Sequence, residues 1–174
     1  MERMITRFQK VDHLLFYKIN GSKQLYRSFF GFVTHLGGAR FTIGIMLLLL
    51  LLSIQQPLLN QTSLVAGFSL IFSHVVMSII KKMVKRIRPY LTLPNAMVHG
   101  YAFKDHSFPS GHSTAIFSIT TPFMIQYPSS ILILLPISWV VAYSRVVLGV
   151  HYPSDVVAGA LLAIITTIGV TFMI

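Results

Sequence analysis

Residues 144–155 place a histidine and a carboxylate at a spacing that could support nucleophilic catalysis. The segment reads SRVVLGVHYPSD. Asp155 follows His151 by four residues, so its carboxylate can accept a hydrogen bond from one ring nitrogen and leave the other free to attack. Pro153 suits the first turn of a helix, and Asp155 suits the positive end of that helix. Arg145, at the end of an apolar stretch, would need a functional partner; the alternative is a salt bridge to Asp155 that only pins two helices.

A second histidine follows a serine and a glycine at the predicted start of an apolar helix. Residues 108–113 read FPSGHS. Ser110 can cap the helix, and Gly111 lets backbone N–H groups approach a ligand. Because helix N-termini favour anions, His112 would stand beside a bound anion and could donate a proton there. The alternative is a simple turn in which His112 serves only as a cap.

A run of basic residues forms the third candidate segment, KKMVKRIRP at 81–89. Lys81 and Arg88 are seven residues apart, which is two turns on a continuous helix. We therefore expect them to point the same way, about 10 Å apart along the axis. Pro89 predicts that this helix ends at Arg88. The alternative is a basic collar that touches anionic lipid.

Together the three segments supply what phosphoryl transfer requires. Lys81, Arg88 and Arg145 can spread positive charge around three phosphate oxygens. Backbone N–H groups near Ser110 and Gly111 add fixed dipoles. One histidine can attack phosphorus while the other protonates the leaving oxygen.

We expect no metal ion and no other cofactor at this site. The chain has four carboxylates and no cysteine. His99, His106, His112 and His151 are spaced unlike standard zinc motifs. The surrounding cations would also repel a metal ion, so the predicted chemistry is metal-independent.

The elements that must position these residues are strongly apolar. The 174-residue chain is 54% hydrophobic and 10% charged, whereas soluble domains are about 25% charged. This composition predicts an all-α integral membrane protein. The net charge of +10 would also suit a nucleic-acid binder, but that function needs a solvated basic face, so we expect no nucleic-acid partner. Five stretches approach the length of about 20 residues that a bilayer core requires: 26–54, 62–80, 113–127, 131–150 and 156–174.

The N-terminal residues 1–23 have a different pattern. Apolar side chains such as Ile5, Phe8 and Leu15 recur at helical spacing among charged residues, which predicts an amphipathic helix in the membrane interface. We expect a single domain over residues 1–174, with residues 24–174 as a transmembrane catalytic bundle. The bundle has five helices, or six if residues 1–23 also cross. We further expect a kink in the first span at the paired glycines 37–38.

Counting five crossings places the candidate residues on one side of the membrane. Residues 81–112 follow the second span, and residues 144–155 follow the fourth. The three segments therefore face the same compartment and can form one site.

The three segments resemble the signatures of the type 2 phosphatidic acid phosphatase superfamily: K-x6-RP at 81–89, PSGH at 109–112 and SR-x5-H-x3-D at 144–155. The resemblance, which covers residues 24–174, implies that His151 forms a phosphohistidine, that Asp155 orients it and that His112 is the acid for the leaving group. The residues implied to hold the phosphate are Lys81, Arg88, Ser110, Gly111 and Arg145. The basic residues outside the signatures are interpreted as lipid-surface charge: Lys82, Lys85, Arg86 and Lys104.

The resemblance implies a phosphatase of lipid phosphates or diphosphates in a bilayer. The compact chain is similar to bacterial enzymes that act on undecaprenyl diphosphate, which we favour, or on phosphatidylglycerophosphate or phosphatidate. Vanadium haloperoxidases resemble the same site, but the membrane spans argue against them. A lipid-phosphate-binding protein without catalysis is a more distant alternative, since both histidines and Asp155 are present.

The sidedness of the site follows from two conflicting arguments. With five crossings, all fourteen Lys and Arg fall on the side of the site, which the positive-inside rule assigns to the cytoplasm. Seven of these cations, however, belong to the catalytic loops, and bacterial relatives mostly place the site outside. We therefore expect a multi-pass protein of the cell membrane with its site on the extracytoplasmic face.

Overall fold

The structure is a computed structural model that describes residues 2–21, 24–100 and 103–174. Within these ranges the chain forms helices and no strand. The helices are α1 (Glu2–Asn20), α2 (Gln24–Val33), η1 (Thr34–Gly37), α3 (Ala39–Leu52), α4 (Pro57–Val84), α5 (Pro89–Thr92), α6 (Gly111–Gln126), η2 (Pro128–Ser130), α7 (Ile131–Val147) and α8 (Pro153–Thr171).

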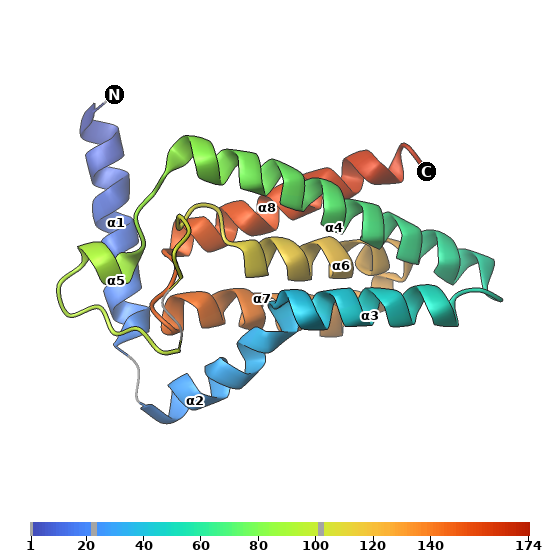
Figure 1. Ribbon diagram of the computed structural model, residues 1–174, viewed down its shortest axis with the longest axis horizontal. Coiled ribbons are helices and arrows are strands. Elements are labelled where there is room, and N and C mark those ends of the chain that lie inside the picture. The colour runs from blue at the N-terminus through green and yellow to red at the C-terminus, as the bar shows by residue number, and fades with distance from the viewer. Residues whose placement is uncertain (1, 22–23, 101–102) are drawn as a thin grey trace.

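Helix α6 is the centre of a bundle that contains α3, α4, α7 and α8 (Figure 1). Residues 113–122 of α6 are all buried. Small hydroxyl side chains join α6 to its neighbours: Ser118 lies 2.8 Å from Ser73 of α4, and Thr120 lies 2.8 Å from Ser138 of α7. Such polar contacts between closely packed helices are typical of membrane bundles. The shortest of the five predicted spans, residues 113–127, therefore lies at the core of the fold.

The lengths and composition of the helices fit a protein that crosses a membrane several times. Three helical segments are long and apolar enough to span: residues 57–92, 128–147 and 153–171. Residues 26–37 and 39–52 are bent by 47° at Gly38 and count as a fourth span if taken together, which confirms the predicted kink. Helix α6 has 16 residues, about 24 Å, and is short for a hydrocarbon core of about 30 Å. The all-helical, multi-pass fold is confirmed, while the number of five spans stays a prediction.

Helix α4 ends earlier than the sequence predicted. It stops at Val84 because Lys85 adopts a left-handed conformation with φ 50°. Arg88 then lies on extended backbone immediately before α5. The expectation that Lys81 and Arg88 share two turns of one helix was therefore wrong. Both side chains still reach the same carboxylate, as described below, because the chain turns back toward the bundle.

The starts of α6 and α8 follow the capping predictions. The Ser110 hydroxyl accepts a hydrogen bond from the Ser113 N–H at 3.4 Å. Pro153 occupies the first turn of α8, and the Asp155 carboxylate accepts from the Tyr152 N–H at 2.9 Å. These two helix starts lie close together, since the Ser110 N–H donates to the Asp155 carbonyl at 3.0 Å.

Helix α1 runs across one end of the bundle rather than along it (Figure 1). Its side chains Asp12, Phe16 and Asn20 are buried, and Phe16 joins the main hydrophobic core with Phe117. The Asn20 amide donates to backbone carbonyls of Met97 and Val147 at 2.8 and 3.0 Å. One face of α1 is therefore part of the protein interior.

Candidate active site

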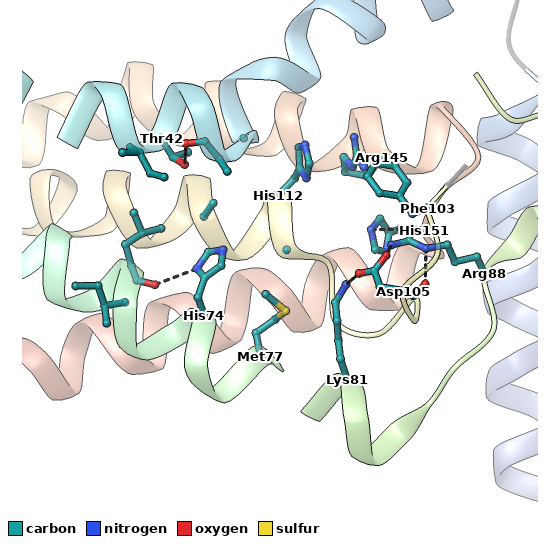
Figure 2. A pocket seen from close by; sticks show the side chains of 17 residues that line it. Thr42, His74, Met77, Lys81, Arg88, Phe103, Asp105, His112, Arg145 and His151 are labelled. Carbon is teal, nitrogen blue, oxygen red and sulfur yellow. Dashed lines mark hydrogen bonds and ion pairs between the residues drawn. The ribbon is translucent and has the colours of Figure 1, made fainter. Parts of the chain in front are cut away.

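A cavity of about 450 Å³ is lined by residues of α3, α4, α6, α7 and the loops that connect the helices. Figure 2 shows that basic and histidine side chains from α4, α6, α7 and the connecting loops converge on it. Six of the predicted site residues line this cavity: Lys81, Arg88, Gly111, His112, Arg145 and His151. The other two do not line it: Asp155 lies 3.5 Å from His151, and the Ser110 hydroxyl caps the start of α6. The fold thus brings the three segments to one place.

His151 is buried, and both of its ring nitrogens face charged partners. Nε2 lies 3.3 Å from Arg88 Nη1. Nδ1 lies 3.5 Å from Asp155 Oδ2 but forms no hydrogen bond in the structure. Burial lowers the pKa of His151 to about 4, although Asp155 opposes this shift, and Arg145 and Arg88 add to it. The imidazole is therefore neutral near pH 7 and keeps the lone pair that an attack requires.

Arg88 is held by four contacts although it is only 2% exposed. Its guanidinium donates to the carbonyls of Asp105 at 2.9 Å and Val150 at 2.8 Å, to the Asp105 carboxylate at 2.6 Å, and faces His151. A buried cation needs such partners to offset its lost hydration. Arg88 is thus fixed beside the candidate nucleophile.

Asp105, which the sequence did not single out, bridges two of the predicted phosphate-binding cations (Figure 2). Its carboxylate forms ion pairs with Lys81 and Arg88. Partial burial opposes ionisation, but the hydrogen bonds and charges of these two cations outweigh it and lower the pKa of Asp105 to about 2. A carboxylate therefore stands where two cations converge, while its side chain remains 51% exposed.

Arg145 is buried at the end of α7 and donates to the Thr34 hydroxyl of η1 at 2.6 Å. The Phe103 ring lies 5.3 Å from the Arg145 guanidinium and 4.7 Å from that of Arg88, so it packs between the two arginines. Arg145 forms no salt bridge with Asp155 in the described structure. The alternative reading of Arg145 as a helix-pinning partner of Asp155 was therefore wrong, and neither Thr34 nor Phe103 carried a signal in the sequence.

Asp155 is fully buried, and three groups hold its carboxylate. Oδ2 accepts from the Ser107 hydroxyl and from the Tyr152 N–H, and Oδ1 accepts from Arg86 Nη1 at 2.7 Å. The interpretation of Arg86 as lipid-surface charge was therefore wrong. Helix α4 ends at Val84, two residues before Arg86, and the chain then turns the Arg86 side chain toward Asp155. Lys82, Lys85 and Lys104 are exposed, as that interpretation requires.

His112 lies in the first turn of α6 and lines the cavity on the side away from Lys81 (Figure 2). It also lines a second cavity of about 510 Å³, which shares Arg145 and Phe103 with the first. Gly37 allows this arrangement, because a Cβ there would lie 3.0 Å from the His112 carbonyl oxygen. His112 therefore lies between the two cavities and lines both of them.

The described residues contain no cluster of three His, Asp or Glu side chains that could hold a metal ion. Metal independence stays a prediction for a chelator to test.

Comparison with known proteins identifies the family of this chain. Residues 62–174 match the model of the PAP2 superfamily, and the chain belongs to that superfamily. It is a PAP2-type membrane phosphatase that hydrolyses lipid phosphates.

Three known proteins illustrate the similarity. The decaprenylphosphoryl-5-phosphoribose phosphatase of Mycobacterium tuberculosis is 36% identical over 134 residues, which are 73% of this chain and 72% of that protein. An undecaprenyl-diphosphatase of Sulfolobus acidocaldarius is 34% identical over 101 residues, 55% of this chain and 49% of that protein. The crystal structure of a PAP2-type phosphatidylglycerolphosphate phosphatase from Bacillus subtilis shares the fold, with a TM-score of 0.80 at 19% identity over 96% of this chain and 86% of that one.

Proposed function

We propose that this protein removes a terminal phosphate from a lipid phosphate or diphosphate through a phosphohistidine at His151, without a metal ion. The observation that carries the proposal is the buried imidazole of His151 in a cavity whose wall also holds Arg88, Arg145 and His112. A neutral nucleophile among fixed cations suits attack on a phosphate, because the cations stabilise the charge of the transferring group.

The reaction takes two steps. In the first, His112 takes up a proton from water as the negatively charged phosphate binds beside it. Nε2 of His151 attacks phosphorus, the bond from phosphorus to the lipid oxygen breaks, and His112 donates its proton to that oxygen. In the second, water attacks the phosphohistidine, and neutral His112 takes a proton from it. The phosphorus–nitrogen bond then breaks, and inorganic phosphate leaves with His151 neutral again. Asp155 stabilises the positive charge on the imidazole between the steps.

Substrate binding exchanges one anion for another. Arg88 and Lys81 pair with Asp105 in the ligand-free protein. A phosphate carries more charge than a carboxylate and offers three oxygens, so it competes well for both cations. The half-exposed side chain of Asp105 can then turn toward water.

The shape of the cavity favours a substrate with a long apolar tail. From the cations the cavity extends along α4 past Met77 and His74 to apolar side chains of α3 and α4, Ile43 and Ile71 among them (Figure 2). A tail can lie there while the phosphate faces His151. The two relatives compared by sequence are both named for polyprenyl lipids. We therefore propose undecaprenyl diphosphate as the substrate; phosphatidylglycerophosphate and phosphatidate are the competing lipids.

We propose that one domain, residues 1–174, sits in the cell membrane with five spans: the bent pair α2–α3, then α4, α6, α7 and α8. Two observations support this placement. Exposed large apolar side chains such as Leu47, Val75 and Ile165 lie along the long helices, and α1 runs across the bundle rather than along it (Figure 1). Helix α1 then lies in the interface beside the site, on the extracytoplasmic face.

The absence of cysteine makes this topology easy to test. Single cysteines at Lys104, near the site, and at Ser129, in the opposite turn, would be treated in intact cells with a membrane-impermeant maleimide. We expect labelling at position 104 only. Labelling at position 129 only would place the site in the cytoplasm.

The function is tested by phosphate release in detergent with excess chelator. The three lipids named above would be compared, using wild-type protein and His151→Ala. We expect chelator-resistant release that the substitution abolishes, with undecaprenyl diphosphate turned over fastest. Binding of the lipids without release would instead support the non-catalytic binding protein, and release unchanged in His151→Ala would refute the phosphohistidine.

A further inference from the structure

A chain of hydrogen-bonded side chains connects the N-terminal helix to the candidate catalytic pair. It begins at Asp155, whose Oδ2 is the oxygen nearest to His151, at 3.5 Å from Nδ1. The other oxygen, Oδ1, accepts from Arg86 Nη1 at 2.7 Å. Arg86 therefore helps to set the orientation of the Asp155 carboxylate from the side opposite His151.

Arg86 is itself aligned on two sides. Its Nη1 also donates to the Ser154 hydroxyl at 2.7 Å, and its Nη2 donates to Asp12 Oδ2 at 2.6 Å. The guanidinium carbon lies 3.8 Å from the centre of the Tyr152 ring. A planar guanidinium held by two carboxylates and an aromatic face has little freedom to turn.

Asp12 completes the chain from α1. It is 4% exposed, and besides Arg86 it accepts from the N–H of Ser154 at 3.0 Å and from the Ser154 hydroxyl at 2.6 Å. Ser154 directly precedes Asp155 at the start of α8. Asp12 of α1 thus contacts both Arg86, which donates to the Asp155 carboxylate, and the backbone of Ser154 that precedes Asp155. Asp12 lies outside residues 62–174, which match the family.

We propose that Arg86 and Asp12 are positioning residues that orient Asp155 toward His151, so that α1 is part of the catalytic unit. This inference rests on the proposed function. Neither residue touches the cavity, so their effect on the reaction passes through Asp155. Hydrogen bonds between an arginine and carboxylates have a defined geometry, which is what a carboxylate that supports an imidazolium requires.

The primary test compares Arg86→Gln with Lys82→Gln in chelated detergent assays. Both remove one cation from the same segment, but Lys82 is exposed. We expect Arg86→Gln to lower kcat on the order of ten- to a hundredfold, as loss of an outer supporting contact commonly does, with KM changed less than about threefold. Lys82→Gln should retain wild-type kcat.

The second pair of variants probes α1. Asp12→Asn keeps the shape of the side chain, and Lys10→Gln changes an exposed neighbour on the same helix. We expect Asp12→Asn to lower kcat about tenfold or more and Lys10→Gln to leave it unchanged. In the double variant with Arg86→Gln, the losses should be clearly less than multiplicative, because both residues act through one carboxylate.

The pH profile separates positioning from a merely structural role. The charged or titratable groups around His151 are Arg88, Arg145 of α7, His112 of α6 and Asp155 of α8. Removing the positive charge of residue 86 leaves Asp155 a stronger attraction for a proton on His151. Removing the negative charge of residue 12 has the opposite effect, because it weakens the attraction for a proton on His151. The acidic limb of kcat/KM should therefore move up by about half a unit in Arg86→Gln and down in Asp12→Asn.

The outcomes decide between this inference and the proposed function. If wild-type protein releases phosphate, His151→Ala does not, and Arg86→Gln and Asp12→Asn both keep kcat within twofold, the positioning role is refuted while the function stands. Loss of activity in both with an unmoved acidic limb would mean that the network only stabilises the fold. If Arg86→Gln does not fold, Arg86→Lys, which keeps the charge without the forked geometry, should show the same loss of kcat. No phosphate release by the wild type would remove the proposed function itself.

Discussion

The charged groups on the buried wall of the cavity and those on its outer rim are held in different ways. On the buried wall, Arg88 and Arg145 are 2% and 3% exposed and donate to fixed acceptors. On the rim, Lys81 pairs with Asp105, whose side chain is 51% exposed. Preorganised buried donors stabilise a transition state without reorganising, whereas a partly solvated pair can exchange partners. We therefore expect the buried wall to stabilise the transition state and the rim to exchange anions.

The largest effect should come from the nucleophile on the buried wall. His151→Ala removes the atom that bonds to phosphorus, so we expect phosphate release to fall by at least about a thousandfold. Incubation with a lipid labelled at its terminal phosphate, followed by an alkaline quench, should trap an acid-labile phosphoenzyme in the wild type only. An acid-stable phosphoenzyme would point to an oxygen nucleophile and would refute the assignment of His151 on the buried wall as the nucleophile.

The next largest effect should come from the buried arginine beside it. Arg88→Lys keeps the charge but loses the contacts to Val150 and Asp105 that a forked guanidinium makes at once. We expect kcat to fall about a hundredfold. Lys81→Arg on the rim should lower kcat much less, because at that position only a positive charge that can exchange its partner is required. Equal losses would show that the rim is as rigid as the wall.

Acid should inactivate the enzyme only far below the usual range for a histidine nucleophile. Burial lowers the pKa of His151 to about 4, so the neutral form persists above that pH and is lost as the pH falls through it. We expect the acidic limb of kcat/KM to reflect a pKa near that value, with a loss of about tenfold per unit below it. A limb near 6.5 would mean that His151 is more hydrated than its burial implies.

A smaller effect is expected at the rim. Asp105→Asn removes the negative charge that competes for Lys81 and Arg88, so vanadate should inhibit the variant at several-fold lower concentration. Lys104→Gln, next to it and exposed, serves as the control. Weaker inhibition of Asp105→Asn would show instead that Asp105 holds the two cations in place for the anion.

Much of the site could be predicted from residue spacing alone. The segments around Lys81, His112 and His151 each carry local chemistry: a cation cluster, a capped helix start, and a histidine with a carboxylate four residues away. Counting crossings put them on one side of the membrane. The family and the phosphatase class follow from these local features and were confirmed by comparison.

The contacts between distant segments could not be predicted in this way. Arg86 looked like one of several surface cations until its partners Asp12 and Asp155 were seen. Asp105 and Phe103 lie in a loop without a periodic pattern, and the left-handed turn at Lys85 decides which basic side chains face inward. If α4 ended one residue earlier or later, we would expect a neighbouring side chain to face Asp12 and Asp155 in place of Arg86.

The sequence by itself determined the membrane setting, the helical class and the chemistry, because apolar runs, capping residues and short-range spacings act over a few turns of chain. Only the tertiary structure decided which cations are buried, which carboxylate pairs with Lys81 and Arg88, and how α1 reaches Asp155. Those outcomes depend on packing between segments up to 142 residues apart, as Ser154 and Asp12 show. Local sequence patterns do not predict contacts between such distant residues. The energy of a buried ion pair depends on the surrounding segments that exclude water from it, and these come together only in the folded protein.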